Sequence, residues 1–143
     1  MPNYWLLKTE PGSYSFADLE RDGVTVWDGV RNNVALKHMR SMQAGDLALI
    51  YHTGTERQVV GIAELTSAPY PDPQADLTDN RPGAVPVVVD VRLVRCLVRP
   101  VSLAAIKAEA FFGDFALVRQ SRLSVVPVNA AQWARLLQLA GET

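Results

Sequence analysis

The longest strand pattern of the chain, VVVDVRLVRCLV at residues 87–98, constrains the fold more than any other feature. On a two-residue period, one face carries only apolar side chains, those of Val87, Val89, Val91 and Leu93. Asp90 and Arg92 interrupt the other face. Because side chains alternate between the two faces of a strand, this pattern predicts a long strand with one apolar face.

Further β-rich runs surround this strand in the sequence. Residues 3–8 and 24–27 predict two short strands, and residues 115–128 supply strand material interrupted by four polar residues. The runs 47–54 and 59–66 are joined by Thr-Glu-Arg-Gln, which predicts a β-hairpin. The chain is therefore expected to form a sheet of five or six strands.

Short helical patterns separate the strands, and each begins at a residue that commonly caps a helix: Ser15, Asn32 or Asn33, Ser102 and Asn129. Asp18 and Gln132 stand three residues after the first and last caps, which predicts a capping box at both helices. The second helix is expected over about residues 34–42, with an apolar stripe of Val34, Leu36, Met39 and Met42. The apolar side of the last helix is formed by Trp133, Leu136, Leu137 and Ala140.

The connection at residues 67–86 holds five prolines. It is therefore expected to be a long surface segment, and neither a helix nor a central strand. Short helices inserted among strands predict an α+β fold, in which a mixed, mainly antiparallel sheet curls into a small barrel. A doubly wound βαβ fold does not fit this order of elements. The 143 residues suit one domain, residues 1–143.

The net charge of −1 argues against a protein that binds nucleic acid through a wholly basic surface. Any contact with nucleic acid is therefore expected to be local. No apolar run approaches the roughly 18 residues of a membrane span. The N-terminus also lacks the basic and then apolar order of a secretory signal. We expect a cytoplasmic protein without a membrane partner.

Signatures of metal, nucleotide and hydrolase sites are absent from the sequence, so no metal, cofactor or catalytic residue is expected. Cys96 is the only cysteine, which excludes an internal disulfide. We expect Cys96 to be a small buried apolar residue. His38 lies in the polar part of a helical pattern and is expected on the surface. His52 ends an apolar strand. It is either a core histidine satisfied by the backbone or a residue that lines or orients a pocket.

Four polar clusters interrupt or end strand patterns, at residues 8–15, 27–33, 51–53 and 119–122. Taken singly, each suits a turn or a helix cap, as Asp28-Gly29 illustrates. Polar groups that are buried without partners are costly, so each cluster is either exposed or part of a satisfied site. Taken together, the clusters are expected to converge on one pocket with Trp27 as a flat wall. A planar, hydrogen-bonding ligand such as a nucleobase suits that pocket best.

Several stretches resemble the EVE domain family: YWLLKTEP, YSFADL, WDGVRNNVA, GDLALIYHT, VVGIAEL, YPD and RQSRLSVVPV, followed by a tryptophan-bearing helix. They stand in collinear order over nearly the whole chain. The resemblance implies a PUA-like β pseudobarrel with short peripheral helices, related to the YTH domains that recognise a methylated adenine in RNA. It also implies a non-catalytic module that reads a modified base in DNA or RNA.

The resemblance places the ligand site on four segments, with these residues: Lys8, Thr9, Glu10, Ser13, Tyr14, Ser15, Trp27, Asp28, Gly29, Val30, Arg31, Asn32, Tyr51, His52, Thr53, Arg119, Gln120, Ser121 and Arg122. Thr53 stands where a serine is more usual in this family. Trp27 is expected to stack on the base, while Asn32 and the backbone of residues 9–15 read its edge. Arg31, Arg119 and Arg122 are expected to contact phosphate or sugar.

Two other functions remain open from the sequence. One is a small-molecule or protein-interaction domain that uses the same pocket. The other is an enzyme acting on a base or nucleotide, with Glu10, Asp28 and His52 as candidate acid and base groups. A monomer is expected in each case.

Overall fold

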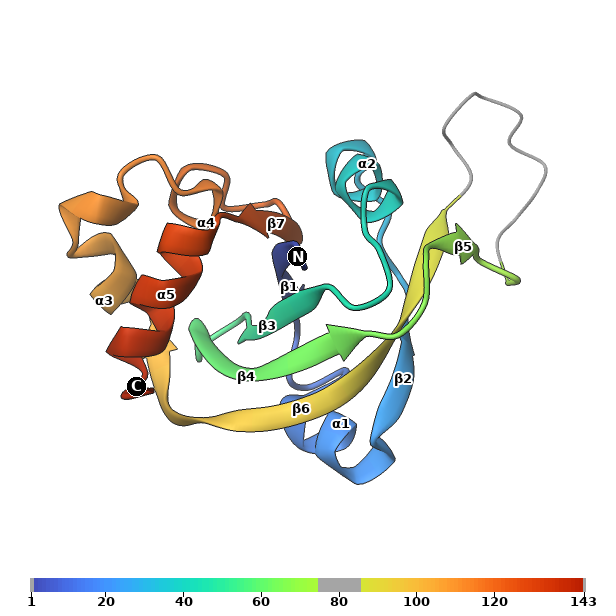
Figure 1. The fold of residues 1–143 in the computed structure, drawn as a ribbon, viewed down its shortest axis with the longest axis horizontal. Coiled ribbons are helices and arrows are strands. Elements are labelled where there is room, and N and C mark those ends of the chain that lie inside the picture. The colour runs from blue at the N-terminus through green and yellow to red at the C-terminus, as the bar shows by residue number, and fades with distance from the viewer. Residues whose placement is uncertain (1, 75–85, 143) are drawn as a thin grey trace.

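The computed structural model of the protein describes residues 2–74 and 86–142. Its strands are β1 (Tyr4–Thr9), β2 (Val24–Trp27), β3 (Leu47–His52), β4 (Gln58–Leu65), β5 (Tyr70–Pro71), β6 (Val87–Ser102) and β7 (Val125–Val128). Its helices are α1 (Phe16–Asp22), α2 (Asn33–Arg40), α3 (Leu103–Lys107), the 3₁₀ turn η1 (Ala110–Phe112), α4 (Ala116–Arg119) and α5 (Ala130–Leu139). Figure 1 shows these helices around one strongly curved sheet.

The sheet is mixed and mainly antiparallel, which confirms the predicted class. Six strands follow the order β2-β6-β4-β3-β1-β7, and β5 pairs separately with β6. Only the pair β1 and β3 is parallel among the strands described. The 47–54 and 59–66 runs form the predicted hairpin, since β3 and β4 pair antiparallel.

The curvature of the sheet comes mostly from β6, which is 16 residues long and bends along its length (Figure 1). Its first part pairs with β2, and the register of its pairing with β4 shifts twice, which marks bulges or irregularities. Helix α2 packs against β6 and also against β7, the last strand of the order. The helix thereby covers the opening between the two ends of the sheet, as expected for a pseudobarrel.

The helix caps follow the sequence prediction. Ser15 and Asn129 each form a full capping box, with Asp18 and Gln132 as the returning side chains. The Oδ1 atom of Asn32 accepts the backbone N–H groups of residues 34 and 35, so Asn32 is the cap of α2. Each cap satisfies N–H groups that have no partner inside the helix, and this fixes where the helix begins.

Two contacts hold the core in register over long sequence distances. Asp46 is only 2% exposed and accepts three N–H groups, from the Asn3 backbone at 3.0 Å, the Trp5 indole at 3.0 Å and the Gln43 backbone at 2.9 Å. Elsewhere, the buried ring of Phe16 covers Gly61 of β4. A Cβ atom at Gly61 would overlap the ring atoms Cζ, Cε1 and Cε2 of Phe16. Neither contact was apparent from local sequence patterns.

Some sequence predictions are wrong. The run 115–128 is not continuous strand, because Ala116–Arg119 forms helix α4 and only Val125–Val128 forms β7. The buried face of α2 consists of Ala35, Leu36 and Met39, whereas Val34 is 48% exposed and the buried Met42 lies beyond the end of the helix. Cys96 of β6 is exposed and not buried.

The proline-rich connection is described only at its two ends. Tyr70–Pro71 forms the short strand β5, which pairs with Val87 and Val88 at the start of β6. Asp90 of β6 accepts the Tyr70 hydroxyl at 2.6 Å, which secures this part of the connection to the sheet. Residues 75–85 of the predicted surface segment lie outside the described residues. No helix among the described residues is long and apolar enough to cross a membrane.

Candidate functional site

The predicted site segments surround a cavity of about 490 Å³ next to Trp27, here called the Trp27 cavity. Nine of the predicted residues line it: Lys8, Thr9, Ser13, Tyr14, Trp27, Asp28, Gly29, Val30 and Arg31. Three further lining residues, Thr25, Val26 and Ser124, were not predicted. Ser124 adjoins the predicted cluster 119–122, and the other two precede Trp27 on β2. The sequence could have indicated these three lining residues only through their position beside predicted ones.

Trp27 is the last residue of β2 and pairs with Val89 of β6, so the sheet fixes its backbone. The side chain is only 7% exposed, and its ring meets the Tyr14 ring edge-on with 6.4 Å between the centroids. Gly29 then turns the chain away with a φ of +79°, a conformation that favours glycine. The indole is therefore held at the cavity wall by rigid neighbours.

The loop after β1 brings Ser13 and Tyr14 to the cavity. Their backbone N–H groups both donate to the carbonyl of Glu10 at 2.9 Å, which closes a tight turn. The Thr9 hydroxyl donates to the carbonyl of Tyr14 at 2.6 Å. The Tyr14 hydroxyl donates to Asp22 of α1 at 2.9 Å, and burial raises the pKa of that hydroxyl above its ordinary value. The loop is therefore held by its own hydrogen bonds.

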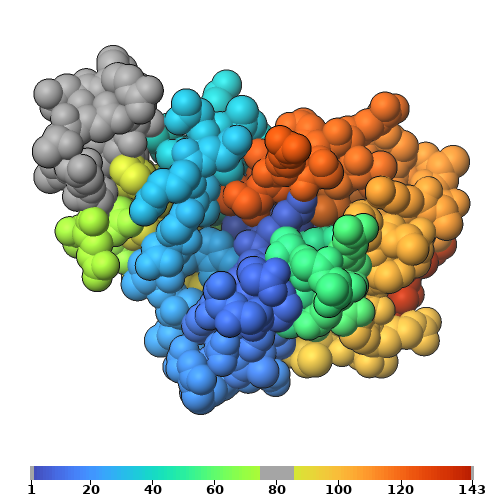
Figure 2. Space-filling model, turned by 180° about the vertical axis from the view of Figure 1, so that it is seen from behind, coloured from blue at the N-terminus to red at the C-terminus, as the bar shows by residue number. Residues whose placement is uncertain are grey.

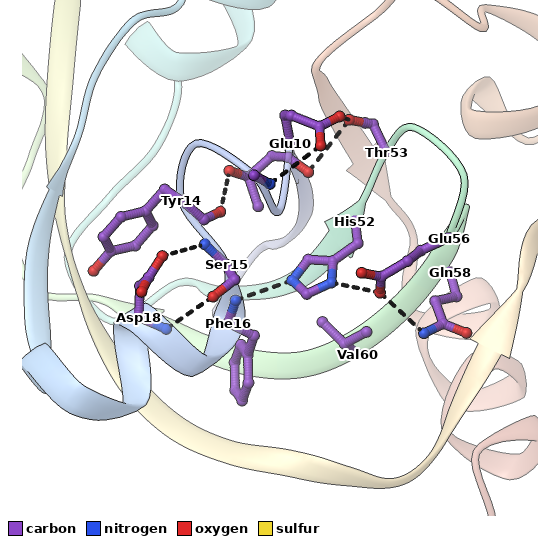
Figure 3. A network of polar contacts seen from close by, with 12 residues as sticks. Glu10, Tyr14, Ser15, Phe16, Asp18, His52, Thr53, Glu56, Gln58 and Val60 are labelled. Carbon is purple, nitrogen blue, oxygen red and sulfur yellow. Dashed lines mark hydrogen bonds and ion pairs between the residues drawn. The ribbon is translucent and has the colours of Figure 1, made fainter.

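His52 of β3 is hydrogen-bonded to the end of this loop (Figure 3). Its Nε2 atom accepts the backbone N–H of Phe16 at 2.9 Å, and its Nδ1 atom lies 2.9 Å from Oε1 of Glu56. A backbone N–H can only donate, so the ring proton of the neutral imidazole belongs on Nδ1 and is donated to Glu56. This bond holds the pKa of the Glu56 carboxyl below its usual range. His52 thus orients the loop and does not line the Trp27 cavity.

Lys8 lies between the Trp27 cavity and a second one. Its Nζ atom donates to the carbonyl of Ser121 at 3.0 Å and stands 5.8 Å from the centre of the Tyr51 ring. Burial lowers the pKa of the Lys8 ammonium from its ordinary value. The backbone N–H of Lys8 also donates to the carbonyl of Ser124 at 3.0 Å. This places the segment 121–124 along the edge of both cavities.

The second cavity, here called the Tyr51 cavity, has a volume of about 360 Å³. The predicted residues on it are Lys8, Tyr51, Thr53 and Ser121. Its other lining residues are Gly54, Arg57, Leu103, Lys107, Leu117 and Val118. The sequence prediction missed Arg57 and Lys107, because both lie in segments that the polar clusters did not include.

A third cavity of about 320 Å³ collects most of the remaining predicted residues. It is lined by Asn32, Arg119, Gln120, Ser121 and Arg122 among the predicted set, with Val34 and Leu123 beside them. Glu10 and Ser15 line none of the three cavities and instead hold the first loop, through Gly12 and Asp18. The four predicted segments therefore meet, but they form three adjoining hollows and not one pocket.

Figure 2 shows the face that carries these hollows. The blue N-terminal segment forms the floor of a depression between the light-blue segment after β2, the green β3–β4 turn and the orange segment around α4 (Figure 2). Within residues 2–74 and 86–142, no group of three or more His, Cys, Asp or Glu side chains is arranged to hold a metal ion. Lys8 and the exposed Arg31 supply cationic side chains to the Trp27 cavity.

Comparisons with known proteins identify the family. The sequence profile described as the EVE domain matches residues 3–139. Thymocyte nuclear protein 1 of Rattus norvegicus is 30% identical over 167 aligned residues, which cover 97% of this chain and 74% of the rat protein. The human protein of the same name is 29% identical over the same fraction of both chains.

Solved structures agree with this match. The NMR structure of Rpa0253 from Rhodopseudomonas palustris is 42% identical, with a TM-score of 0.86, and the match covers 97% of this chain and 93% of that one. The crystal structure of human THYN1 protein in complex with DNA containing 5-methylcytosine is 26% identical, with a TM-score of 0.85 and 99% of both chains covered. These matches also confirm the α+β, PUA-like class. The chain therefore belongs to the EVE domain family.

Proposed function

We propose that this chain is a non-catalytic DNA-binding module that holds one modified base, extruded from the duplex, in the Trp27 cavity. The observation that carries the proposal is the cavity itself, with a volume of about 490 Å³ and the indole of Trp27 on its wall. Ligand pockets in proteins commonly measure about 300–1,000 Å³. A relative with the same fold, human THYN1 protein, has been crystallised with DNA that contains 5-methylcytosine.

Base stacking supplies the main affinity in this proposal. Stacking on an aromatic side chain contributes about 1–3 kcal/mol per base, and it does not require a strongly basic protein surface. This agrees with the net charge of −1. Polar lining groups, including the side chains of Ser13, Asp28 and Arg31, are available to pair with the edge of the base or with its sugar and phosphate.

The arrangement of His52 supports a binding function over catalysis. Of the three candidate acid and base groups, only Asp28 lines the Trp27 cavity. Both ring nitrogens of His52 are engaged, by Phe16 and Glu56, and Glu10 is engaged by Gly12 and Thr53. A general acid or base must reach the reacting group of the substrate. The geometry therefore favours a module that binds without turnover.

The test is equilibrium binding to three duplexes that differ at one central position, which holds 5-methylcytosine, cytosine or an abasic site. The wild type is expected to bind the modified duplex most tightly and the abasic duplex most weakly. Trp27→Leu is expected to weaken binding of the modified duplex by about 5- to 150-fold, the equivalent of one lost stacking interaction. Trp27→Phe keeps an aromatic face and is expected to retain most of the affinity.

Trp133→Leu is the matched control, because Trp133 and Trp27 are both 7% exposed but Trp133 lies on α5 and outside the three cavities. Both leucine variants are expected to lose comparable stability in thermal unfolding, and only Trp27→Leu is expected to lose the affinity. A single methyl group contributes about 0.8 kcal/mol, or about fourfold, so the cytosine duplex is expected to bind only moderately more weakly. Equal binding of the abasic and modified duplexes would contradict the proposal.

A further inference from the structure

The Tyr51 cavity has the composition of an anion site, and the proposed function above does not use it. Three cationic side chains line it, those of Lys8, Arg57 and Lys107, and they come from β1, the β3–β4 turn and α3. No carboxylate is among its described lining residues. The carboxylate of Glu10 lies nearby, where it accepts the Thr53 hydroxyl at 3.3 Å. The charge of the cavity lining is therefore strongly positive, although the chain as a whole is slightly negative.

Tyr51 gives the cavity a hydroxyl donor that has no hydrogen-bond partner among the described residues. The side chain is only 3% exposed, and its hydroxyl makes no hydrogen bond within residues 2–74 and 86–142. Every fully enclosed side-chain N or O atom of these residues does have a partner, so the Tyr51 hydroxyl must reach the open space of the cavity that it lines. Burial raises the pKa of this hydroxyl, so it remains an O–H donor at neutral pH.

Arg57 and Lys8 are held in place and still have free donor capacity. The Nε–H of Arg57 donates to the carbonyl of Gly54 at 3.2 Å, which leaves both terminal nitrogens of the guanidinium for a ligand. Its backbone φ is +49°, a strained value for a residue other than glycine, and such strain is often found at functional positions. Lys8 uses one N–H for the Ser121 carbonyl and has two more.

We propose that the Tyr51 cavity binds a phosphate group of the nucleic-acid backbone, next to the nucleotide whose base enters the Trp27 cavity. This inference rests on the proposed function. Lys8 lines both cavities, so a base in one and its neighbouring phosphate in the other would share that residue. A phosphodiester offers acceptor oxygens to guanidinium, ammonium and hydroxyl donors, which are the donors of this cavity. Backbone contacts of this kind set the position of the strand and carry no base selectivity.

The test uses the double variant Arg57→Gln/Lys107→Gln on the same three duplexes, over a series of salt concentrations. Binding of all three is expected to fall by about 10-fold or more, because charge-assisted hydrogen bonds are lost. The slope of log Kobs against log salt is expected to become shallower by about 1. The preference for the modified over the abasic duplex is expected to stay unchanged. Tyr51→Phe, which removes only the hydroxyl, is expected to weaken binding about 2- to 10-fold.

The matched control is Arg92→Gln/Arg95→Gln, which removes the same charge from β6 outside the three cavities. A second arm replaces single phosphates beside the target base by neutral methylphosphonates. One such linkage is expected to weaken binding by the wild type and to have a clearly smaller effect on the Arg57/Lys107 double variant, which keeps only Lys8 and the Tyr51 hydroxyl as donors. If no linkage behaves in this way, or if both double variants have equal affinity and salt slope, the inference is wrong.

Three further outcomes separate this inference from its alternatives. If inorganic phosphate alone binds at millimolar concentration and no methylphosphonate has an effect, the cavity takes a free phosphate and the inference is overturned. If the methylphosphonate effect is present but the modified and abasic duplexes bind equally, the phosphate site stands and the proposed base site fails. If base preference is present without any methylphosphonate effect, the base site stands and the phosphate site fails.

Discussion

Asp46→Ala is expected to lower the free energy of unfolding by about 3–5 kcal/mol, since each buried donor left without a partner costs about 1–3 kcal/mol. Asp46 is 2% exposed and accepts the N–H groups of Asn3, the Trp5 indole and Gln43. These groups belong to the start of β1 and to the turn after α2. Loss of the carboxylate would therefore leave three donors unsatisfied and loosen the junction between the parallel strands β1 and β3.

The measurement is urea denaturation followed by circular dichroism. Asp46→Asn keeps one acceptor oxygen at the same position and is expected to have an intermediate stability. Asp114→Ala is the surface control, because the Asp114 side chain is fully exposed, and it is expected to change stability by less than about 0.5 kcal/mol. An Asp46→Ala protein as stable as the Asp114→Ala protein would show that the three hydrogen bonds contribute nothing net.

Gly61→Val is expected to destabilise the protein by about 3 kcal/mol or more, because extra methyl groups in a packed core force neighbouring atoms to move. The first atom added, Cβ, already overlaps the Cζ, Cε1 and Cε2 atoms of Phe16. Phe16 is 3% exposed and begins α1, where its N–H donates to His52. Displacement of the ring is therefore also expected to disturb the loop that carries Ser13 and Tyr14.

A double-variant cycle isolates this contact. Phe16→Leu removes all three ring atoms that a Cβ at Gly61 would meet. The smaller substitution Gly61→Ala is expected to cost about 1–3 kcal/mol in the wild type, and less than half of that in the Phe16→Leu protein. Thermal and urea unfolding give the four stabilities. Equal costs in the two backgrounds would show that the Phe16 ring is not what excludes a side chain at Gly61.

The parts of the fold that sequence predicts well are those governed by neighbouring residues. A capping box needs only a serine or asparagine and a partner three residues on, and both predicted boxes are present. The β3–β4 hairpin needs two apolar runs and a short polar link, and it is also present. The pattern at 115–128 predicts strand because Phe115 and Val118 have strand propensity. Packing against β7 and α3 instead holds these residues in and around helix α4.

Contacts that depend on distant residues could not be predicted. The Asp46 site joins residues separated by 41 and 43 positions, and its sequence, Ala-Gly-Asp, suggests only the end of a helix. The candidate site shows the same division. The local clusters indicated which residues would be polar and close to Trp27. They did not indicate that these residues line three separate cavities, two of which share Lys8. Arg57 and Lys107 reach the Tyr51 cavity from a turn and a short helix that look ordinary in the sequence.

The central claim, that a modified base enters the Trp27 cavity, is tested most directly by photocrosslinking. A duplex with 5-iodocytosine at the target position places iodine where the methyl group of 5-methylcytosine stands, and irradiation couples that carbon to a nearby aromatic side chain. After trypsin digestion, mass spectrometry is expected to find the cross-link in residues 22–31, at Trp27, or in residues 9–21, at Tyr14. Cross-links confined to β6 or α5 would contradict the account.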